Sequence, residues 1–260
     1  MPEKCGRSIT MPDFNVDGVI FDLGSTLLEY ENIPWVTLNL KCLESGYNYL
    51  LDEGYHPPSL EEFTGTYIEV REKFRAKAAK TLEEYDIVEP IRVMLDKAGL
   101  NTDDGLAERF FASYYEPVAK QLTIFGDTLT VLKEIKNSGK KIGLVSNTIF
   151  PESFHQAELE RFQLAPYFDF TIFSSSFGYR KPHQRIYSEA IKLIEIPAGR
   201  LLFVGDRYLE DFQGPRKSGM QAAIKYREGR EYPDPMSKDV TVVKTLTELL
   251  PMLGLRSYSN

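Results

Sequence analysis

The chain has 260 residues, of which 42% are hydrophobic and 27% are charged, so it can bury a large core as one domain or as a core with an insert. Its formal net charge of −7 argues against nucleic acid or an anionic membrane as the main partner. Two cysteines, Cys5 and Cys42, are too few for a disulfide framework, and no apolar run is long enough to cross a membrane.

Residues 1–13 are polar and interrupted by prolines, without the apolar stretch of a secretory signal. We therefore expect an N-terminal tail. The low cysteine content is typical of a reducing compartment, so we also expect a cytoplasmic protein.

The first strong pattern is a short apolar run, Val19 to Phe21, that ends in Asp22, a Gly-Ser turn and Thr26. An apolar run this short, bounded by turn residues, is typical of a buried parallel strand. Asp22 would then lie at the C-terminal end of the strand, where open α/β sheets place their ligands. A single Asp in this position is more often a turn residue, so the downstream sequence has to decide.

Residues 32–121 show helical periodicity and no strand-like run. The pattern predicts helices over 35–53, 59–80 and 90–98, and a fourth that begins at Thr102. In the first helix, one apolar stripe is predicted from Val36, Leu40, Leu43, Tyr47, Leu50 and Leu51. The second helix opens with Ser59 and Glu62 at the spacing of a capping box.

From residue 122 onward, strand-like and helix-like stretches alternate. Strands are predicted at 142–145, 170–173, 201–204, 222–224 and 240–243, and helices at 128–137, 152–162, 184–194, 209–218 and 246–253. Alternation of this kind predicts an α/β fold with a doubly wound parallel sheet. We expect a core domain of residues 14–31 plus 122–260, interrupted by an α-helical cap domain of residues 32–121.

Polar residues of complementary type follow the predicted strands. They are Asp22 after the first strand, Ser146 and Asn147 after the second, Arg180 and Lys181 in the loop after the third, and Asp206 and Asp211 after the fourth. Because parallel strands end at one edge of a sheet, these side chains are expected to share a cleft. Clustered carboxylates suit a hard cation such as Mg²⁺, which completes its coordination with water and substrate phosphate.

These four segments, in this order, resemble the haloacid dehalogenase (HAD) superfamily of aspartate-nucleophile phosphohydrolases. The helical insert is similar to the C1 cap of its subfamily I. The resemblance implies that Asp22 is the nucleophile that forms an aspartyl-phosphate. It also implies that Lys181 neutralises charge on the nucleophile and the phosphate.

The resemblance implies roles for the remaining strand-end residues as well. Thr26, Ser146 and Asn147 match positions that support the nucleophile loop and bind the phosphate. Asp206 and Asp211 match the acidic pair that holds Mg²⁺, together with Asp22 and the backbone carbonyl at position 24.

Gly24 departs from the family pattern, because phosphatases of the family usually carry there a second Asp that acts as general acid and base. A positioned acid or base contributes roughly 10²–10⁴ in rate. The loss would lower the cleavage rate fully for a poor leaving group and much less for an activated one, whose conjugate acid has a low pKa. We therefore expect a slow enzyme or one suited to activated leaving groups.

The resulting expectation is a Mg²⁺-dependent hydrolase of a small phosphorylated metabolite, as a monomer or homodimer. One alternative is a catalytically silent HAD-like protein that binds phosphate and regulates, because of Gly24. Another is a haloacid-type dehalogenase, although the family's dehalogenases lack the Gly-Asp pair found at Gly205 and Asp206. The sequence leaves open the substrate and the roles of Arg180 and Arg207.

Overall fold

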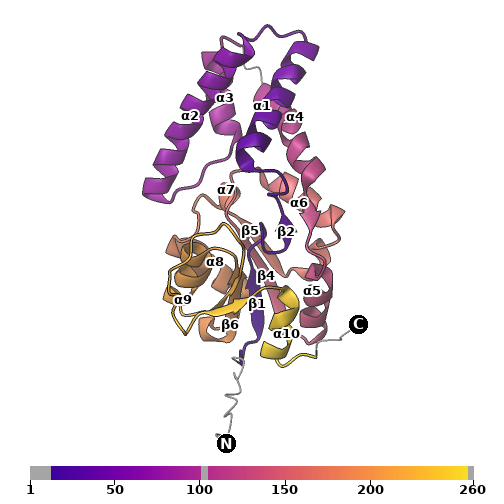
Figure 1. The fold of residues 1–260 in the computed structure, drawn as a ribbon, viewed down its shortest axis with the longest axis vertical. Helices are drawn as coiled ribbons and strands as arrows, with labels where there is room; N and C mark the ends of the chain where they lie inside the picture. Colours follow the sequence, from indigo (N-terminus) through magenta and orange to yellow (C-terminus); the bar gives the residue numbers. More distant parts are fainter. Residues whose placement is uncertain (1–12, 101–104, 257–260) are drawn as a thin grey trace, which may run out of the picture.

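The computed structural model describes residues 13–100 and 105–256, and its centre is a six-stranded parallel sheet of order β5-β4-β1-β6-β7-β8 (Figure 1). The strands are β1 (Gly18–Phe21), β4 (Lys141–Ser146), β5 (Phe170–Phe173), β6 (Leu201–Gly205), β7 (Gln221–Lys225) and β8 (Thr241–Val243). Helices lie on both sides of this sheet. The predicted doubly wound α/β fold is therefore confirmed.

The side chains along a strand pack alternately into two apolar layers, because successive side chains point to opposite faces of the sheet. In β1, Val19 and Phe21 pack into the layer under α5 (Thr128–Asn137) and α10 (Leu249–Met252). Ile20 packs on the other face, with residues of α8 (Gln184–Ile194). Since both faces are buried, the strands are continuous apolar runs.

The remaining elements of this part of the chain are short. They are α6 (Glu152–Arg161), α7 (Ser174–Phe177), a π-helical turn (Tyr208–Gln213), α9 (Gly214–Lys217) and 3₁₀ turns at Ala165–Tyr167, Ala198–Arg200 and Leu246–Glu248. The helix expected at 209–218 is thus divided between the π-helical turn and α9. The helix expected at 246–253 is likewise divided between a 3₁₀ turn and α10.

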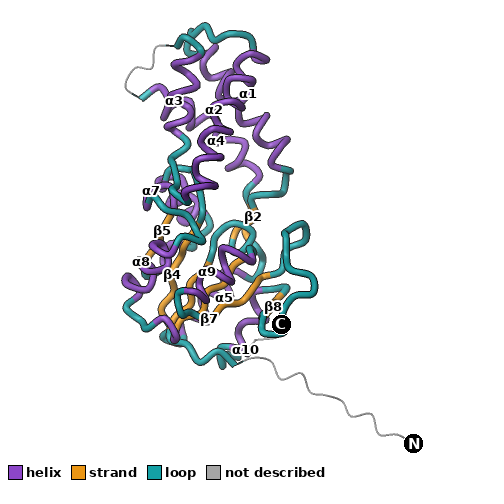
Figure 2. The backbone as a smooth tube through the Cα atoms, turned by 90° about the vertical axis from the view of Figure 1, so that its left-hand side faces the viewer, coloured by secondary structure: helices purple, strands orange, loops and turns teal. Residues whose placement is uncertain are grey.

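Four helices stand beyond the C-terminal edge of the sheet (Figures 1 and 2). They are α1 (Trp35–Asp52), α2 (Leu60–Thr81), α3 (Val88–Lys97) and α4 (Leu106–Gln121), here called the helical module. The chain enters and leaves the module through an antiparallel pair that the sequence did not reveal, β2 (Leu28–Glu29) with β3 (Thr123–Ile124). The domain boundaries at 32 and 121 stay a prediction.

The predicted start of the second helix of the module is confirmed. The capping box is present, because the backbone N–H of Glu62 donates to the Ser59 hydroxyl and the Glu62 carboxylate accepts from the Ser59 backbone. The predicted start of the fourth helix, Thr102, lies outside the described residues. None of the described helices is both long and apolar enough to pass through a membrane.

The apolar stripe predicted for α1 was partly wrong. Leu43 and Leu50 are buried as predicted, but Val36, Leu40 and Leu51 are 79%, 55% and 47% exposed. The buried face consists of Leu38, Cys42, Leu43, Gly46 and Leu50. The pattern misled because a glycine and a cysteine carry little hydrophobic signal, although both allow α4 to pack closely against α1.

We predict that Gly46→Ala destabilises the protein, because a Cβ at residue 46 would lie 2.5 Å from Cζ of the Phe110 ring on α4. Overpacking of this kind costs about 1–3 kcal/mol of unfolding free energy. Urea denaturation measures the change. Gly65→Ala on α2 is the matched control, because a Cβ there meets nothing within 4 Å and alanine should stabilise the helix by about 0.5–1 kcal/mol. Equal stabilisation by both variants would contradict the described α1–α4 packing.

Candidate active site

Three neighbouring strands bring the first site residues together. β1 lies between β4 and β6 in the sheet, so Asp22, which follows β1, lies between Ser146 at the end of β4 and Asp206 after β6. The backbone N–H of Asp22 continues the ladder by donating to the carbonyl oxygen of Val204, at 2.9 Å. All three side chains are buried, so the sheet edge fixes their relative positions.

Lys181 is the central cation of this cluster. Its Nζ donates to Asp22 Oδ1 at 2.7 Å, to Asp211 Oδ1 at 2.7 Å and to the Val145 carbonyl oxygen at 2.9 Å. These three bonds use all the donors of an ammonium group. Burial alone would lower the pKa of Lys181, but Asp211 and Asp22 outweigh it and raise that pKa, so the ammonium form is maintained.

Asn147 holds the backbone of Lys181 in place. Its Oδ1 accepts from the Lys181 N–H at 2.7 Å, and its Nδ2 donates to the Lys181 carbonyl oxygen at 2.9 Å. Thr26 acts on the nucleophile candidate, since its hydroxyl donates to Asp22 Oδ2 at 3.3 Å. The direct substrate contact predicted for Asn147 stays a prediction, as does the one for Ser146.

The π-helical turn brings Asp211 back to the sheet edge. Its Oδ2 accepts from the Arg207 N–H at 2.9 Å, and the carboxylate packs against the backbone of Gly205, where any Cβ would overlap it. The glycine before Asp206 is therefore required by the close approach of Asp211. Single π-helical turns of this kind are frequent at functional sites.

Asp22, Asp206 and Asp211 form a buried carboxylate cluster, in which one oxygen from each lies within 4.8 Å of the others. Burial and the neighbouring carboxylates raise the pKa of Asp22 and of Asp206 above the usual range, although Lys181 and Arg230 oppose this. A divalent cation would remove this repulsion and favour the ionised carboxylates. The donor set therefore fits a hard cation held by oxygen ligands.

Arg230 is a site residue that the sequence analysis missed. Its Nε donates to Asp206 Oδ2 at 2.5 Å, and its Nη2 donates to Ser25 Oγ at 3.0 Å and Glu31 Oε1 at 2.6 Å. It reaches the site from the loop after β7, whose end lies at the same sheet edge. That strand end was the available signal, but only the strand order shows that the loop faces Asp206.

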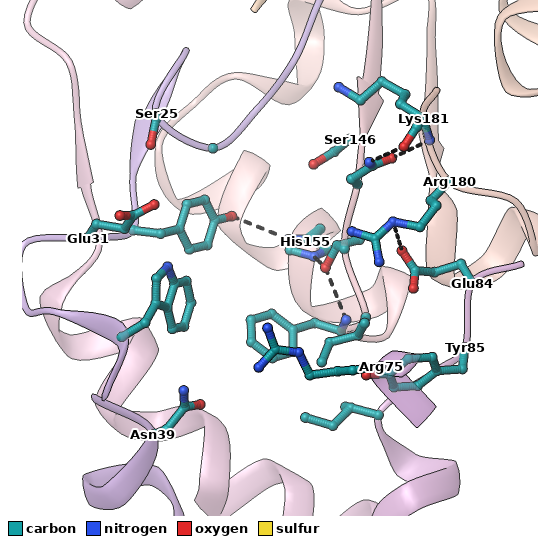
Figure 3. A pocket seen from close by; sticks show the side chains of 18 of the residues that line it. Ser25, Glu31, Asn39, Arg75, Glu84, Tyr85, Ser146, His155, Arg180 and Lys181 are labelled. Atoms are coloured by element: carbon teal, nitrogen blue, oxygen red, sulfur yellow. Dashed lines mark hydrogen bonds and ion pairs between the residues drawn. The ribbon is translucent and has the colours of Figure 1, made fainter. Parts of the chain in front are cut away.

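A cavity of about 430 Å³ lies between the sheet edge and the helical module. Figure 3 shows Ser146 and Lys181 on the sheet side and Asn39, Arg75 and Tyr85 on the module side. Arg180 and Arg207, whose roles the sequence left open, both line it. Other lining residues include Asp22, Gly24, Tyr30, Trp35, Arg71, Glu84, His155 and Arg230.

A buried polar network supports one wall of this cavity. His155 Nδ1 lies 2.7 Å from Glu158 Oε2, and its Nε2 lies 2.7 Å from the Thr148 hydroxyl. The hydroxyl of Tyr30 donates to the same Glu158 oxygen at 2.5 Å. His155 is thus a satisfied core residue, although its ring also reaches the cavity.

Several known proteins are similar to this chain in sequence or in fold. The family model described as haloacid dehalogenase-like hydrolase matches residues 16–219. A glyceraldehyde 3-phosphate phosphatase of Methanothermobacter thermautotrophicus is 28% identical over 145 residues, which cover 54% of this chain and 63% of the relative. Haloacid dehalogenase-like hydrolase domain-containing protein 3 of Homo sapiens is 30% identical over 152 residues, which cover 57% of this chain and 58% of that protein.

The chain therefore spans less than two thirds of the length of these two relatives. Among solved structures, a 2-haloacid dehalogenase from Pseudomonas syringae pv. Tomato DC3000 is similar with a TM-score of 0.70 and 20% identity. The match covers 92% of this chain and 98% of that one. At this identity the likeness concerns the fold alone.

We predict that Mg²⁺ stabilises the protein, because a cation that binds only the folded cluster adds its binding free energy to stability. At 100 times the dissociation constant this contributes about 2.7 kcal/mol, or roughly 5–10 °C in Tm. Thermal denaturation with and without Mg²⁺ measures the shift, with NaCl at equal ionic strength as control. Asp206→Asn should lose most of the Mg²⁺-induced shift, and an equal shift in this variant would refute the assignment of Asp206 as a ligand.

Proposed function

Since the chain belongs to the haloacid dehalogenase-like hydrolase family, we propose that it is a Mg²⁺-dependent phosphatase of small phosphorylated metabolites. One observation carries the proposal. Lys181 joins Asp22 and Asp211 inside a buried cluster of three carboxylates, at the floor of a cavity large enough for a metabolite. This arrangement combines a carboxylate nucleophile, a fixed cation and oxygen ligands for a metal.

In the proposed reaction a carboxylate oxygen of Asp22 attacks phosphorus. The bond from phosphorus to the leaving oxygen breaks, and an aspartyl-phosphate forms. Asp22 Oδ2 is the less engaged oxygen, because among the described residues it accepts one long hydrogen bond, from Thr26, whereas Oδ1 is held by Lys181. Water then attacks the aspartyl-phosphate, which releases phosphate and restores the carboxylate.

The surrounding residues have electrostatic and positioning roles in this proposal. The Lys181 ammonium offsets charge on the phosphoryl oxygens, and Ser146 orients them. Mg²⁺, held by Asp22, Asp206 and Asp211 with the Gly24 carbonyl, would supply further positive charge opposite those oxygens. Asn147 positions Lys181 through its two backbone hydrogen bonds.

One of the relatives supports phosphoryl transfer over the alternatives. The first relative named above is a phosphatase of a small phosphorylated aldehyde. Carbon–halogen hydrolysis needs no metal ligands, so the buried pair of Asp206 and Asp211 favours a phosphatase over a dehalogenase. Gly24 motivates the catalytically silent alternative, and a measurement of turnover distinguishes it from an active phosphatase.

The protein should release phosphate from p-nitrophenyl phosphate in the presence of Mg²⁺, and EDTA should abolish this activity. Asp22→Asn, which removes the nucleophile with little change in shape, should lower kcat by at least about 10³-fold. Asp52→Asn, at the exposed end of α1, is the control and should behave like wild type. Activity that survives EDTA or Asp22→Asn would disprove the mechanism, and Mg²⁺ binding without turnover would favour the silent alternative.

Gly24→Asp should increase turnover of alkyl phosphates, because it restores an acid and base beside the nucleophile. The cavity accepts a side chain at this position, since a Cβ on Gly24 would meet only the Tyr30 ring, at an ordinary 3.5 Å. The expected gain approaches about 10²–10⁴-fold for an alkyl ester and is much smaller for an aryl ester. Steady-state kinetics of wild type and Gly24→Asp with ethyl phosphate and p-nitrophenyl phosphate measure the two gains. The absence of a gain for ethyl phosphate would refute the prediction.

A further inference from the structure

We propose that the cavity contains a second subsite, formed by Arg71 of α2 and Glu84, that binds the far end of a phosphorylated hydroxy acid. Arg71 would bind the carboxylate of such a substrate, and Glu84 would bind a hydroxyl group near it. This inference rests on the proposed function for the phosphate end and names the class of substrate.

Two unpartnered atoms point to this subsite. Within residues 13–100 and 105–256, the buried side-chain polar atoms that lack a hydrogen-bond partner are Arg71 Nε and Glu84 Oε1. Both residues line the same cavity. An unsatisfied buried donor or acceptor costs free energy, and native proteins rarely keep one without a reason. A ligand with an acceptor for Arg71 and a hydroxyl for Glu84 would satisfy both.

Arg71 is held in a geometry suited to binding an anion. Its guanidinium carbon lies 5.5 Å from the centroid of the Tyr67 ring, and its Nη2 is 3.2 Å from Glu72 Oε1. Glu72 does not line the cavity, so it anchors one end of the guanidinium while Nε remains available. The planar guanidinium can direct its remaining N–H donors at a planar carboxylate.

The same wall of the cavity carries excess positive charge. Arg71, Arg75 and Arg180 line the cavity together with Glu84. The other lining carboxylates, Asp22 and Glu31, are paired with Lys181 and Arg230. Figure 3 shows Arg180, Glu84, Tyr85 and Arg75 following one another down one side, away from Ser146 and Lys181. A substrate with its phosphate at the sheet edge would therefore present its other end to these cations, and an anionic end would be complementary.

Glu84 favours a hydroxyl partner. Its Oε2 accepts from Ser174 Oγ at 3.0 Å and lies 3.7 Å from Arg180 Nε, so Oε1 is the oxygen left for a ligand. Burial raises the pKa of Glu84, although Arg180, Ser174 and the Tyr85 amide oppose this. A hydroxyl can donate to the carboxylate or accept from the carboxylic acid, so it suits both forms. An ammonium group would suit only the ionised form.

Two matched pairs of substrates test the carboxylate. They are 3-phosphoglycerate against glycerol 3-phosphate, and 6-phosphogluconate against glucitol 6-phosphate, so each pair differs at the carboxylate end. In at least one pair, wild type should prefer the carboxylate member by about tenfold or more in kcat/KM. Arg71→Met should reduce that preference to near one. Lys73→Met is the control, because Lys73 lies on α2, pairs with Glu69 and is exposed, so it should keep the preference.

A third comparison tests the hydroxyl. Wild type should prefer 3-phosphoglycerate over 3-phosphonooxypropanoate, which lacks the hydroxyl, and Glu84→Met should lose this preference. Because Glu84→Met also removes the partner of Ser174 and Arg180, its thermal stability is measured alongside. If that variant does not fold, the substrate comparison in wild type and the Arg71→Met result decide.

Failure of the subsite and failure of the proposed function can be told apart. Absent turnover of p-nitrophenyl phosphate would refute the function. Calorimetric titration of the Asp22→Asn variant with both members of each pair then still tests the subsite, because it needs binding alone. Preferential binding of the carboxylate member, lost in Asp22→Asn combined with Arg71→Met, supports the subsite. Equal affinities for the two members in both pairs, or equal kcat/KM values in both pairs for an active enzyme, would overturn the proposed subsite.

Discussion

The contact of the Lys181 ammonium with Asp22 and Asp211 is the interaction on which the site depends. Three carboxylates cannot remain ionised together in a buried position without compensation, because desolvation and mutual repulsion both favour the protonated acids. Lys181 lies 2.7 Å from two of them, and Arg230 pairs with the third. Removing the partner of a buried charge typically costs about 3–5 kcal/mol, so the site and the stability of its surroundings are coupled.

The strand order explains how residues so distant in sequence reach this contact. β1 lies in the middle of the sheet, with β4 and β6 as parallel neighbours, so the ends of three strands deliver Asp22, Ser146 and Asp206 side by side. Lys181 then enters from a loop and Asp211 from the π-helical turn at the same edge. The Asn147 amide fixes the backbone of Lys181, and the lack of a side chain at Gly205 leaves room for the Asp211 carboxylate.

Much of this sheet edge could be predicted from the sequence, because a polar residue directly after a buried parallel strand must lie at the C-terminal edge of the sheet. Asp22 and Asp206 are such residues. Arg230 could not be placed, since it lies five residues beyond the end of β7, in a loop whose direction depends on tertiary structure. The inner face of α1 was misjudged in part for a related reason, because Gly46 and Cys42 are buried by close helix contact although neither carries a strong hydrophobic signal.

The far wall of the cavity was even less accessible to sequence reasoning. Arg71 and Arg75 lie on a helix rich in exposed charge, where an arginine is usually a solvated surface residue. What distinguishes Arg71 is its Nε, which has no hydrogen-bond partner among the described residues and belongs to a side chain that lines the same cavity as Asp22. Such a feature is a property of packing in three dimensions and leaves no periodic signal in the chain.

Backbone hydrogen bonds nevertheless join the module side of the cavity to the sheet side. The Glu84 N–H donates to the Gly178 carbonyl oxygen at 3.0 Å, and the Arg180 N–H donates to the Leu82 carbonyl oxygen at 3.0 Å. The segment that carries Glu84 is therefore hydrogen-bonded to the stretch from Gly178 to Arg180, which directly precedes Lys181. Because Lys181 in turn holds Asp22, a displacement of the helical module at this point would also displace the cation beside the nucleophile. The module can thus influence the chemistry through the backbone as well as through the side chains that face the substrate.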